Sequence, residues 1–339
     1  MMKKELGLFT LLVVLCLAVC GVEFAQQMHN GASLATLKLP RFLSPENLSN
    51  LSQRVGMYGI LAIGMGFIII TGGIDLSVGS VCALTGVLIS MALQDWHWSW
   101  PLAVSFILIL SMLLGAAHGY LVTKKKIQPF IVTLCGMLIY RGLARSIAHE
   151  STRGFSGVEN LNFLQYLASG SFLGVSMTFI LLAVIAVVAW FLLHRSVYGR
   201  YLFAVGRNEN ATRFSGINTK LVIGSSYVVA GLLTGIAAIM CAFYSSSVSP
   251  SIHANMFEVY AIAAAVLGGC SLRGGEGSII GIVIGAALLQ VLRNLIIILG
   301  IENSYDSVVT GTVILIAVLV DQFFQERGDK KSRVRAAGH

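Results

Sequence analysis

Residues 53–94, QRVGMYGILAIGMGFIIITGGIDLSVGSVCALTGVLISMALQ, decide the fold of this chain. Two apolar runs, predicted to be helices over 53–72 and 77–94, are joined by a glycine-dense segment that carries Asp75. Each run has about the length that a helix needs to cross a hydrocarbon core of about 30 Å. Interrupted helices of this kind are typical of transporters. The stretch therefore predicts two membrane helices with a functional candidate between them.

The composition extends this prediction to the whole chain. Its 339 residues are 56% hydrophobic and only 11% charged, whereas soluble domains carry roughly 25% charged residues. The mean hydropathy is +0.82. We therefore expect an all-α polytopic membrane protein surrounded by the lipid bilayer. The net charge of +8 does not indicate a nucleic-acid partner, because the basic residues lie in short loops between apolar runs and at the C-terminus.

Uninterrupted apolar runs predict about ten transmembrane helices. We place them at 6–25, 53–72, 77–94, 99–122, 129–148, 174–194, 221–243, 257–271, 277–299 and 305–324. The third and eighth are short and contain glycines, which is also typical of re-entrant or broken helices. Residues 1–325 are expected to form a single transmembrane domain, followed by a basic cytoplasmic tail over 326–339.

The lysines and arginines predict the orientation, because cytoplasmic loops carry an excess of both. With the N-terminus inside, sixteen of the 23 become cytoplasmic, four lie outside (Lys38, Arg41, Arg54 and Arg153), and the remaining three lie within spans (Arg141, Arg145 and Arg293). An even number of spans also brings both basic termini to the same side. The first span ends in Leu17-Ala18-Val19-Cys20, similar to a lipoprotein-type signal peptide, but valine before the cysteine departs from that pattern. We therefore expect an N-in, C-in protein with a retained signal anchor.

A second glycine-dense break matches the first. Residues 268–278, GGCSLRGGEGS, again join two apolar runs and carry an acidic residue. Interrupted helices at corresponding places in two halves mark the working region of many transporters. Tight helix packing alone also produces glycine-rich breaks. The pattern is consistent with two weakly related halves.

Two loops are long enough to hold structure. The outer loop, 26–52, is polar and contains Pro40 and Pro45, so it is expected to run irregularly over the surface. The inner loop, 195–220, carries five basic residues. Within it, Asn208 as N-cap and Gly216 as terminator predict a short helix over 209–214. This helix suits docking of a cytoplasmic partner, although positive charge that fixes the topology also explains the loop.

Ionisable residues at membrane depth are functional candidates, because burying them is expensive. Asp75 suits either a helix cap or a gating residue. Glu258 opens the eighth span and suits either a helix N-terminus or a gate. Arg141 and Arg145 lie one turn apart, so they either pair with acids across a pore or reach the outer interface. His118 is expected to be a packing residue.

Enzyme signatures are missing from the sequence. No Gly-x-x-x-x-Gly-Lys-Ser/Thr motif is present to cradle phosphates, so energy must come from another chain or from an ion gradient. The six cysteines form no Cys-x-x-Cys pair, and neither a metal nor a cofactor is indicated. The sequence predicts a transport protein rather than an enzyme.

Four segments resemble ribose-type ABC sugar permeases, in the order and spacing of that family. They are residues 69–80 (IITGGIDLSVGS), 199–218 (from Gly199-Arg200-Tyr201 to Ser215-Gly216-Ile217-Asn218), 261–269 (AIAAAVLGG) and 314–321 (ILIAVLVD). The resemblance covers about residues 43–321. It implies the membrane-spanning permease subunit of an ABC importer in the bacterial inner membrane, translocating a monosaccharide such as ribose.

The resemblance also implies partners and site residues. The partners are a cytoplasmic ABC ATPase, a periplasmic sugar-binding protein and a second permease copy, identical or related. The ATPase-coupling loop maps onto Gly199, Arg200, Asn208, Glu209, Ala211, Gly216 and Asn218. The translocation or gating candidates are Gly73, Asp75, Ser77, Arg141, Glu258 and Tyr260. Tyr260 departs from the family, whose members typically have aspartate there, so the substrate or the partner can differ from that of ribose systems.

Two other classes of protein fit the sequence less well. An ion-coupled secondary transporter of a small polar solute needs intramembrane carboxylates, and Asp75 and Glu258 are the only fair candidates. A membrane-embedded hydrolase needs paired catalytic groups at a common depth. No His-Glu-x-x-His motif is present, and His118 and His253 are expected on opposite sides of the membrane.

Overall fold

The computed structural model describes residues 2–29 and 38–300, together with residues 305, 308, 311, 312 and 315. The predicted span 305–324 lies almost entirely outside these residues, and the predicted tail 326–339 lies wholly outside them. The elements are α1 (Met2–His29), η1 (Arg41–Leu43), α2 (Pro45–Ile70), α3 (Val78–Gln94), α4 (Trp100–Thr123), α5 (Pro129–Ile147), β1 (Arg153–Gly154), α6 (Asn162–Ser169), β2 (Ser171–Phe172), β3 (Val175–Ser176), α7 (Met177–His194), α8 (Val197–Arg207), α9 (Glu209–Phe214), α10 (Thr219–Ser245), β4 (Ser247–Val248), α11 (Phe257–Leu267) and α12 (Ile279–Ile298).

Seven helices of the described part are long and apolar enough to cross a membrane, namely α1, α2, α4, α5, α7, α10 and α12. The all-α polytopic fold is therefore confirmed. The two spans predicted to be short or broken are α3, with 17 residues, and α11, with 11 residues. At 1.5 Å per residue α11 is only about 17 Å long, too short to cross the hydrocarbon core. It ends before the predicted boundary because the chain turns at Gly268 and Gly269, and Gly269 has φ +89°.

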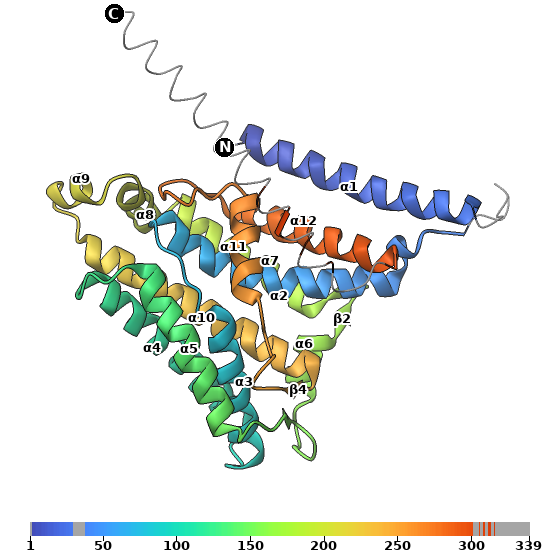
Figure 1. Cartoon of the computed structure of the whole chain (residues 1–339), viewed down its shortest axis with the longest axis horizontal. Coiled ribbons are helices and arrows are strands. Elements are labelled where there is room, and N and C mark those ends of the chain that lie inside the picture. The colour runs from blue at the N-terminus through green and yellow to red at the C-terminus, as the bar shows by residue number, and fades with distance from the viewer. Residues whose placement is uncertain are drawn as a thin grey trace, which may run out of the picture.

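The core is built around α2, which lies between α7, α10, α11 and α12 (Figure 1). In its most apolar window, 94% of the residues are buried inside the protein, against 22% for α4 and α7. Glycines permit this close packing. An added Cβ at Gly56 would lie 2.6 Å from the backbone of Thr178, and one at Gly64 would lie 3.2 Å from Ala230. Small residues at helix contacts are the usual solution inside a membrane.

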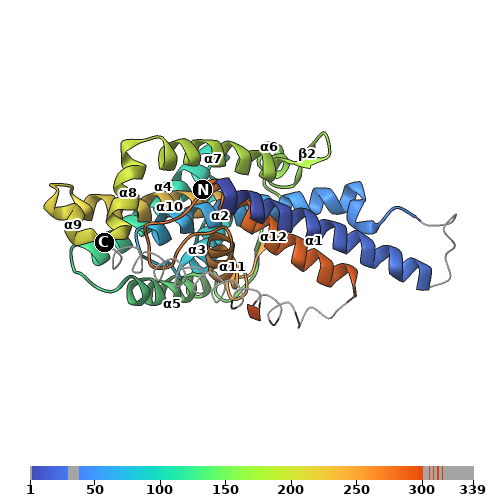
Figure 2. The same ribbon diagram turned by 90° about the horizontal axis from the view of Figure 1, so that it is seen from above.

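Helix α1 lies at the periphery beside α12 (Figure 2). A carboxylate near each end ties it to the rest of the protein. Glu23 accepts hydrogen bonds from the backbone N–H groups of Arg41 (3.0 Å) and Phe42 (2.8 Å). At the other end, Glu5 accepts a hydrogen bond from the Ser278 hydroxyl. These contacts join α1 to the segment before α2 and to the start of α12.

The two ends of the bundle differ in charge. One end, here called the α9 end, carries α8, α9, the second glycine break and the loop with Lys126. The opposite end, here called the β4 end, carries β4, α6 and the β2–β3 hairpin (Figure 1). Arg153, predicted to lie outside, is at the β4 end, where it pairs with Asp95 (3.0 Å). The N-in, C-in orientation stays a prediction.

Two expectations about loops were wrong. The loop 26–52 is largely ordered, because α1 continues to His29 and α2 already begins at Pro45, with Ser44 as its N-cap. The connection between α5 and α7 was not expected to hold structure, yet it carries β1, α6 and a β2–β3 hairpin. Strand β1 pairs antiparallel with β4, joining Arg153 to Val248. The hairpin turns at Leu173 and Gly174, which both have positive φ.

Candidate functional site

The first glycine break holds Asp75 in a buried turn before α3. Its Oδ1 accepts hydrogen bonds from the Ser77 backbone N–H (2.8 Å) and from the Ser77 hydroxyl (2.6 Å). Ser77 is the residue that precedes α3. Asp75 therefore holds the residue that precedes α3, and the gating roles suggested for Asp75 and Ser77 stay predictions.

The other oxygen of Asp75 faces His118. The distance from Asp75 Oδ2 to His118 Nδ1 is 3.7 Å, and both side chains are buried. His118 Nε2 is 2.9 Å from the hydroxyl of Tyr140 on α5. His118 is thus more than a packing residue, because it links the break to α5. The Tyr227 hydroxyl, buried and without a hydrogen-bond partner among the described residues, packs against Gly73, where an added Cβ would lie 2.7 Å away.

Arg141 anchors the segment between α10 and α11. Its guanidinium donates hydrogen bonds to the backbone carbonyls of His253 (2.7 Å) and Pro250 (3.2 Å). The sequence led us to expect that Arg141 would pair with acids across a pore or reach the outer interface. Its partners are instead backbone carbonyls of a neighbouring segment. Arg145, one turn away, is exposed and pairs with Glu150 at 2.8 Å. Only the first arginine therefore holds distant parts of the chain together.

Glu258 lies in the first turn of α11 and is buried. Its carboxylate lies against the start of α3, where a Cβ on Gly79 would overlap Glu258 Oε2 and the Ala254 carbonyl. A carboxylate is stabilised near a helix N-terminus. Glu258 consequently connects the beginnings of two short helices, α3 and α11.

The segment that Arg141 anchors also contains a buried histidine. His253 packs near Gly86 of α3, and its Nε2 has no hydrogen-bond partner among the described residues. Burial, together with the nearby positive charge of Arg141, lowers the pKa of His253 to about 4. The imidazole is therefore neutral at physiological pH. Three non-glycine residues around it, Ser246, Ala254 and Met256, have positive φ.

Tyr260 takes part in a different cluster. Its ring lies edge-on to that of Tyr58, with 5.4 Å between the centroids. The guanidinium of Arg293 lies 4.5 Å from the centre of the Tyr260 ring and 5.8 Å from that of Tyr58. Cation–π contacts of this kind stabilise a buried positive charge. Tyr260 thus contributes to holding Arg293 in place.

The inner loop folds as predicted around α9. The helix covers Glu209–Phe214, and the Asn208 side chain accepts a hydrogen bond from the Ala211 N–H at 2.9 Å. Gly216 ends it with φ +84°, a conformation that favours glycine. Asn218 caps the following helix α10 by accepting from the Leu221 N–H (3.2 Å).

Helix α8, which precedes α9, was not predicted. It begins after Ser196, whose hydroxyl accepts a hydrogen bond from the Gly199 N–H at 3.1 Å. Gly199 is required here, because an added Cβ would overlap the Leu193 carbonyl. A serine N-cap before an apolar-periodic run was the sequence signal for this helix.

Phe214 is a surface residue that the sequence analysis did not select. Its side chain is 86% exposed at the end of α9, and the Arg213 guanidinium lies 6.0 Å from its ring centre. Aromatic residues and arginine are enriched in protein interfaces. An aromatic residue inside a basic loop was the available signal. The face of α9 therefore has the chemistry of a docking surface.

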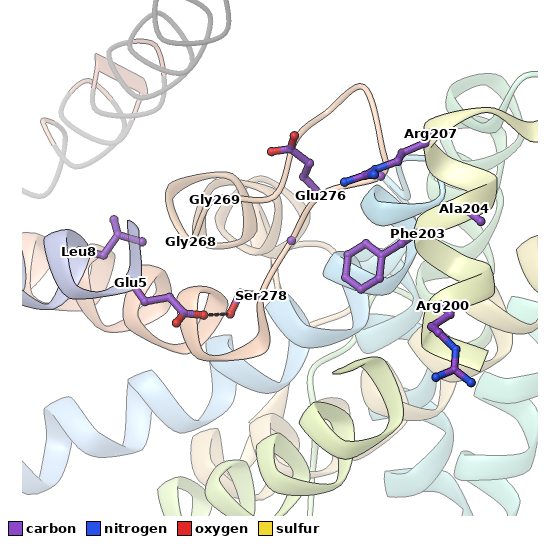
Figure 3. Close-up of a pocket in the computed structure, with 12 residues that line it drawn as sticks. Glu5, Leu8, Arg200, Phe203, Ala204, Arg207, Gly268, Gly269, Glu276 and Ser278 are labelled. Carbon is purple, nitrogen blue, oxygen red and sulfur yellow. Dashed lines mark hydrogen bonds between the residues drawn. The ribbon is translucent and has the colours of Figure 1, made fainter. Parts of the chain in front are cut away.

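Two pockets flank α8 and α9. The larger, of about 630 Å³, lies between α8, the second glycine break and the first turns of α1 (Figure 3), and is lined by Glu5, Leu8, Arg200, Phe203, Ala204, Arg207, Gly268, Gly269, Gly275, Glu276, Gly277 and Ser278. The smaller, of about 430 Å³, lies beside the first break and is lined by residues that include Gly73, Lys126, Glu209, Arg213 and Tyr227. Each break thus faces one side of the inner loop.

The structure sorts the selected residues into separate groups. The coupling-loop residues gather at the α9 end, and Gly73, Asp75 and Ser77 lie in the break next to them. Glu258 lies against the start of α3, Arg141 of α5 holds the segment before α11, and Tyr260 belongs to the cluster around Arg293. The sequence did not mark His118 and Tyr140 as functional, because their roles depend on neighbours from other helices.

Comparison with known proteins identifies the family of this chain. The family described as "Branched-chain amino acid transport system / permease component" matches residues 47–318. The chain is 39% identical over 290 residues to the ribose import permease protein RbsC of Escherichia coli (strain K12), covering 86% of this chain and 89% of that protein. It is 39% identical over 292 residues to RbsC of Bacillus subtilis (strain 168), covering 84% and 87%.

A xylose system gives a further match. The xylose transport system permease protein XylH of Haemophilus influenzae is 32% identical over 342 residues, covering 83% of this chain and 90% of that protein. No solved structure matches the chain. The resemblance to ribose-type ABC sugar permeases is confirmed, and the chain belongs to the branched-chain amino acid transport system / permease component family, as a multi-pass permease of the bacterial inner membrane.

Proposed function

We propose that this chain is the permease subunit of an ABC importer that translocates a monosaccharide, a ribose-like pentose or a related sugar. The observation that carries the proposal is the 39% identity to a ribose import permease over 86% of the chain. The family description mentions branched-chain amino acids, but the individual relatives act in ribose and xylose systems. Differences of a few hydrogen bonds decide between such sugars.

A separate cytoplasmic ATPase supplies the energy and docks on the inner loop. The support is the exposed Phe214 beside Arg213 on α9 and the missing phosphate-cradling motif in the sequence. The contact involves Asn208, Glu209 and Ala211, which form the first turn of α9. A side chain that is bare in the isolated subunit becomes buried when the partner binds, which makes Phe214 the expected anchor.

A second permease copy covers one face of α5. Leu138, Gly142, Arg145 and Ser146 are exposed along this helix, and nothing lies within 4 Å of a Cβ placed on Gly142. Arginine and serine facing lipid are disfavoured, so this face suits a protein contact or a polar path. The sugar-binding protein then docks at the β4 end, opposite the ATPase.

The gate is assigned to the two breaks and their buried polar residues. Asp75 with Ser77 fixes the start of α3, Glu258 bridges α3 and α11, and Arg141 holds the segment before α11. A change in any of these contacts moves a short helix relative to the core. The residues act by positioning helices, and none of them hydrolyses a substrate.

The test is uptake by proteoliposomes containing this chain, the ATPase and the binding protein encoded beside it. Labelled ribose, xylose and hexoses are supplied with ATP or with an ion gradient. We expect uptake that requires both ATP and the binding protein, and that is lost when Ala211 and Gly216 are replaced by bulky charged residues. Uptake by this chain alone, driven by protons or sodium, would overturn the proposal.

A further inference from the structure

Three backbone segments from distant parts of the sequence meet at the α9 end. They are the end of α2 with the first glycine break, the end of α8, and the second glycine break. The Gly275 N–H donates a hydrogen bond of 2.8 Å to the Ile70 carbonyl. Carbonyls in the last turn of a helix lack intrahelical partners, so this bond completes α2 with a donor from the other break.

The end of α8 fits between the two breaks without any intervening side chain. A Cβ on Gly206 would overlap the Ile70 carbonyl and the Gly275 nitrogen. A Cβ on Gly274 would lie 2.9 Å from the Gly206 oxygen and 3.0 Å from the Gly72 nitrogen. We call Gly72, Gly206, Gly274 and Gly275 the glycine junction. Only glycine allows these backbones to approach so closely.

The next residue, Arg207, closes the junction on the side of the larger pocket. A Cβ on Gly275 would lie 2.5 Å from Arg207 Cγ and 3.0 Å from the Arg207 nitrogen. In Figure 3, Arg207 and Phe203 project from α8 toward the segment that carries Glu276. Contact between α8 and the second break is therefore made by the helix backbone and by the side chain at its end.

We infer that the glycine junction makes α8 and both breaks one rigid unit, so that a displacement of α8 moves α3 and α11 together. Backbone contacts have no rotamers with which to absorb a shift, and α8 packs at Gly206 directly against the Ile70 carbonyl and the Gly275 nitrogen, the two groups that bond the breaks to each other. Gly206 is then a positioning residue for transport. The inference rests on the proposed function, since it assumes that the ATPase moves the inner loop.

The first experiment measures coupling in the reconstituted complex. Gly206→Ala is compared with Gly224→Ala, a matched control on α10 where nothing lies within 4 Å of the added Cβ. We expect Gly206→Ala to keep ATPase binding and ATP hydrolysis but to lower the sugar moved per ATP by about tenfold or more, as small misplacements do in catalytic sites. Gly224→Ala should leave this ratio unchanged. An unchanged ratio in both variants overturns the inference.

The second experiment does not depend on a variant at the junction. Spin labels are placed at Tyr201 on α8, Leu272 in the second break and Leu173 at the β4 end, all exposed positions, after Cys16, Cys20 and Cys135 are replaced by serine. Dilution with unlabelled chain isolates distances within one copy. We expect the distance between 201 and 272 to stay constant between nucleotide-free and ATP-bound complexes, while that between 272 and 173 changes.

The outcomes separate the inference from the proposed function. If wild-type complex shows no ATP-dependent uptake, the proposed function fails, whatever the label distances are. If wild-type complex transports but the distance between 201 and 272 changes with nucleotide, α8 moves relative to the break and the rigid junction is wrong. A constant distance together with uncoupling by Gly206→Ala supports the inference.

Discussion

The backbone N–H of Gly275 is hydrogen-bonded to the carbonyl of Ile70 at 2.8 Å, so the two glycine breaks touch directly although they come from opposite halves of the chain. The first break ends α2 and precedes the short helix α3, and the second ends α11 and precedes α12. Because the breaks touch, the turn before α3 and the turn before α12 are held against each other.

Phe214 is predicted to be the anchor for the ATPase. Replacing Phe214 by alanine removes an aromatic side chain that is 86% exposed in the subunit, and should weaken ATPase binding about 30-fold, the effect of a typical interface hot spot. Leu173→Ala is the matched control, because Leu173 is 89% exposed at the β4 end. Titration of the ATPase onto the permease in nanodiscs measures both. Equal affinities in the two variants would contradict the assignment.

Asp75 is predicted to be required for stability through its hydrogen bonds to Ser77. Asp75→Ala leaves a buried N–H without its acceptor and His118 without its carboxylate, at a cost of about 3 kcal/mol. Asp75→Asn keeps an acceptor for Ser77 and should lose less. Thermal unfolding in detergent gives the order wild type, Asn, Ala. If Asp75→Asn is fully stable but inactive in uptake, the carboxylate has a gating role beyond the cap.

Arg141 and Arg145 form a matched pair for a mutational test. Arg141→Gln removes charge-assisted bonds to two carbonyls and should destabilise the protein by about 2 kcal/mol. Arg145→Gln affects only an exposed ion pair and should leave the melting temperature unchanged. A cysteine placed at Ala254, which is buried, should react with an external thiol reagent faster in Arg141→Gln. Equal reactivity in all three proteins would show that Arg141 does not hold the segment.

Acidification should destabilise the segment around His253. The pKa of His253 in the folded protein is about 4, below its ordinary value of about 6.5. The unfolded chain therefore binds more protons between these two values, and stability falls as the pH drops from about 6.5 to about 4. The loss amounts to about 3 kcal/mol at most.

Melting temperatures between pH 7.5 and pH 4 test this dependence. His253→Leu should flatten the curve, and its stability at neutral pH should not fall much, because Nε2 has no partner to lose among the described residues. His97→Leu, at an exposed position, should retain the slope of the wild type. A slope that His253→Leu leaves intact would assign the pH dependence to other groups.

Local signals in the sequence were sufficient for some elements. The bounds of α9 follow from Asn208 and Gly216, because a cap and a terminator act within one turn of the helix. A serine N-cap, Ser196, marks the start of α8 in the same way. The membrane helices follow from hydropathy alone, and the shortness of α11 follows from Gly268 and Gly269.

Contacts between distant segments of the chain could not be predicted from the sequence. The glycines of both breaks indicated close approach but not which backbone would approach Gly206. Arg141 and Arg145 have the same residue type and nearly the same position, and only the path of the segment through Pro250 and His253 distinguishes them. His118 acquires its role because α4 brings it to Asp75. Such contacts depend on how the helices pack, which no local pattern encodes.

The exposure of Phe214 has a consequence for how the subunit survives in a cell. If the ATPase docks on α9 as proposed, a permease inserted without it leaves Phe214 uncovered, an aromatic side chain of the kind that proteases and chaperones bind. Unassembled copies should therefore be degraded faster than assembled ones, and the amount of ATPase would set the amount of permease. Balanced synthesis of the two chains then becomes a requirement that a single side chain imposes.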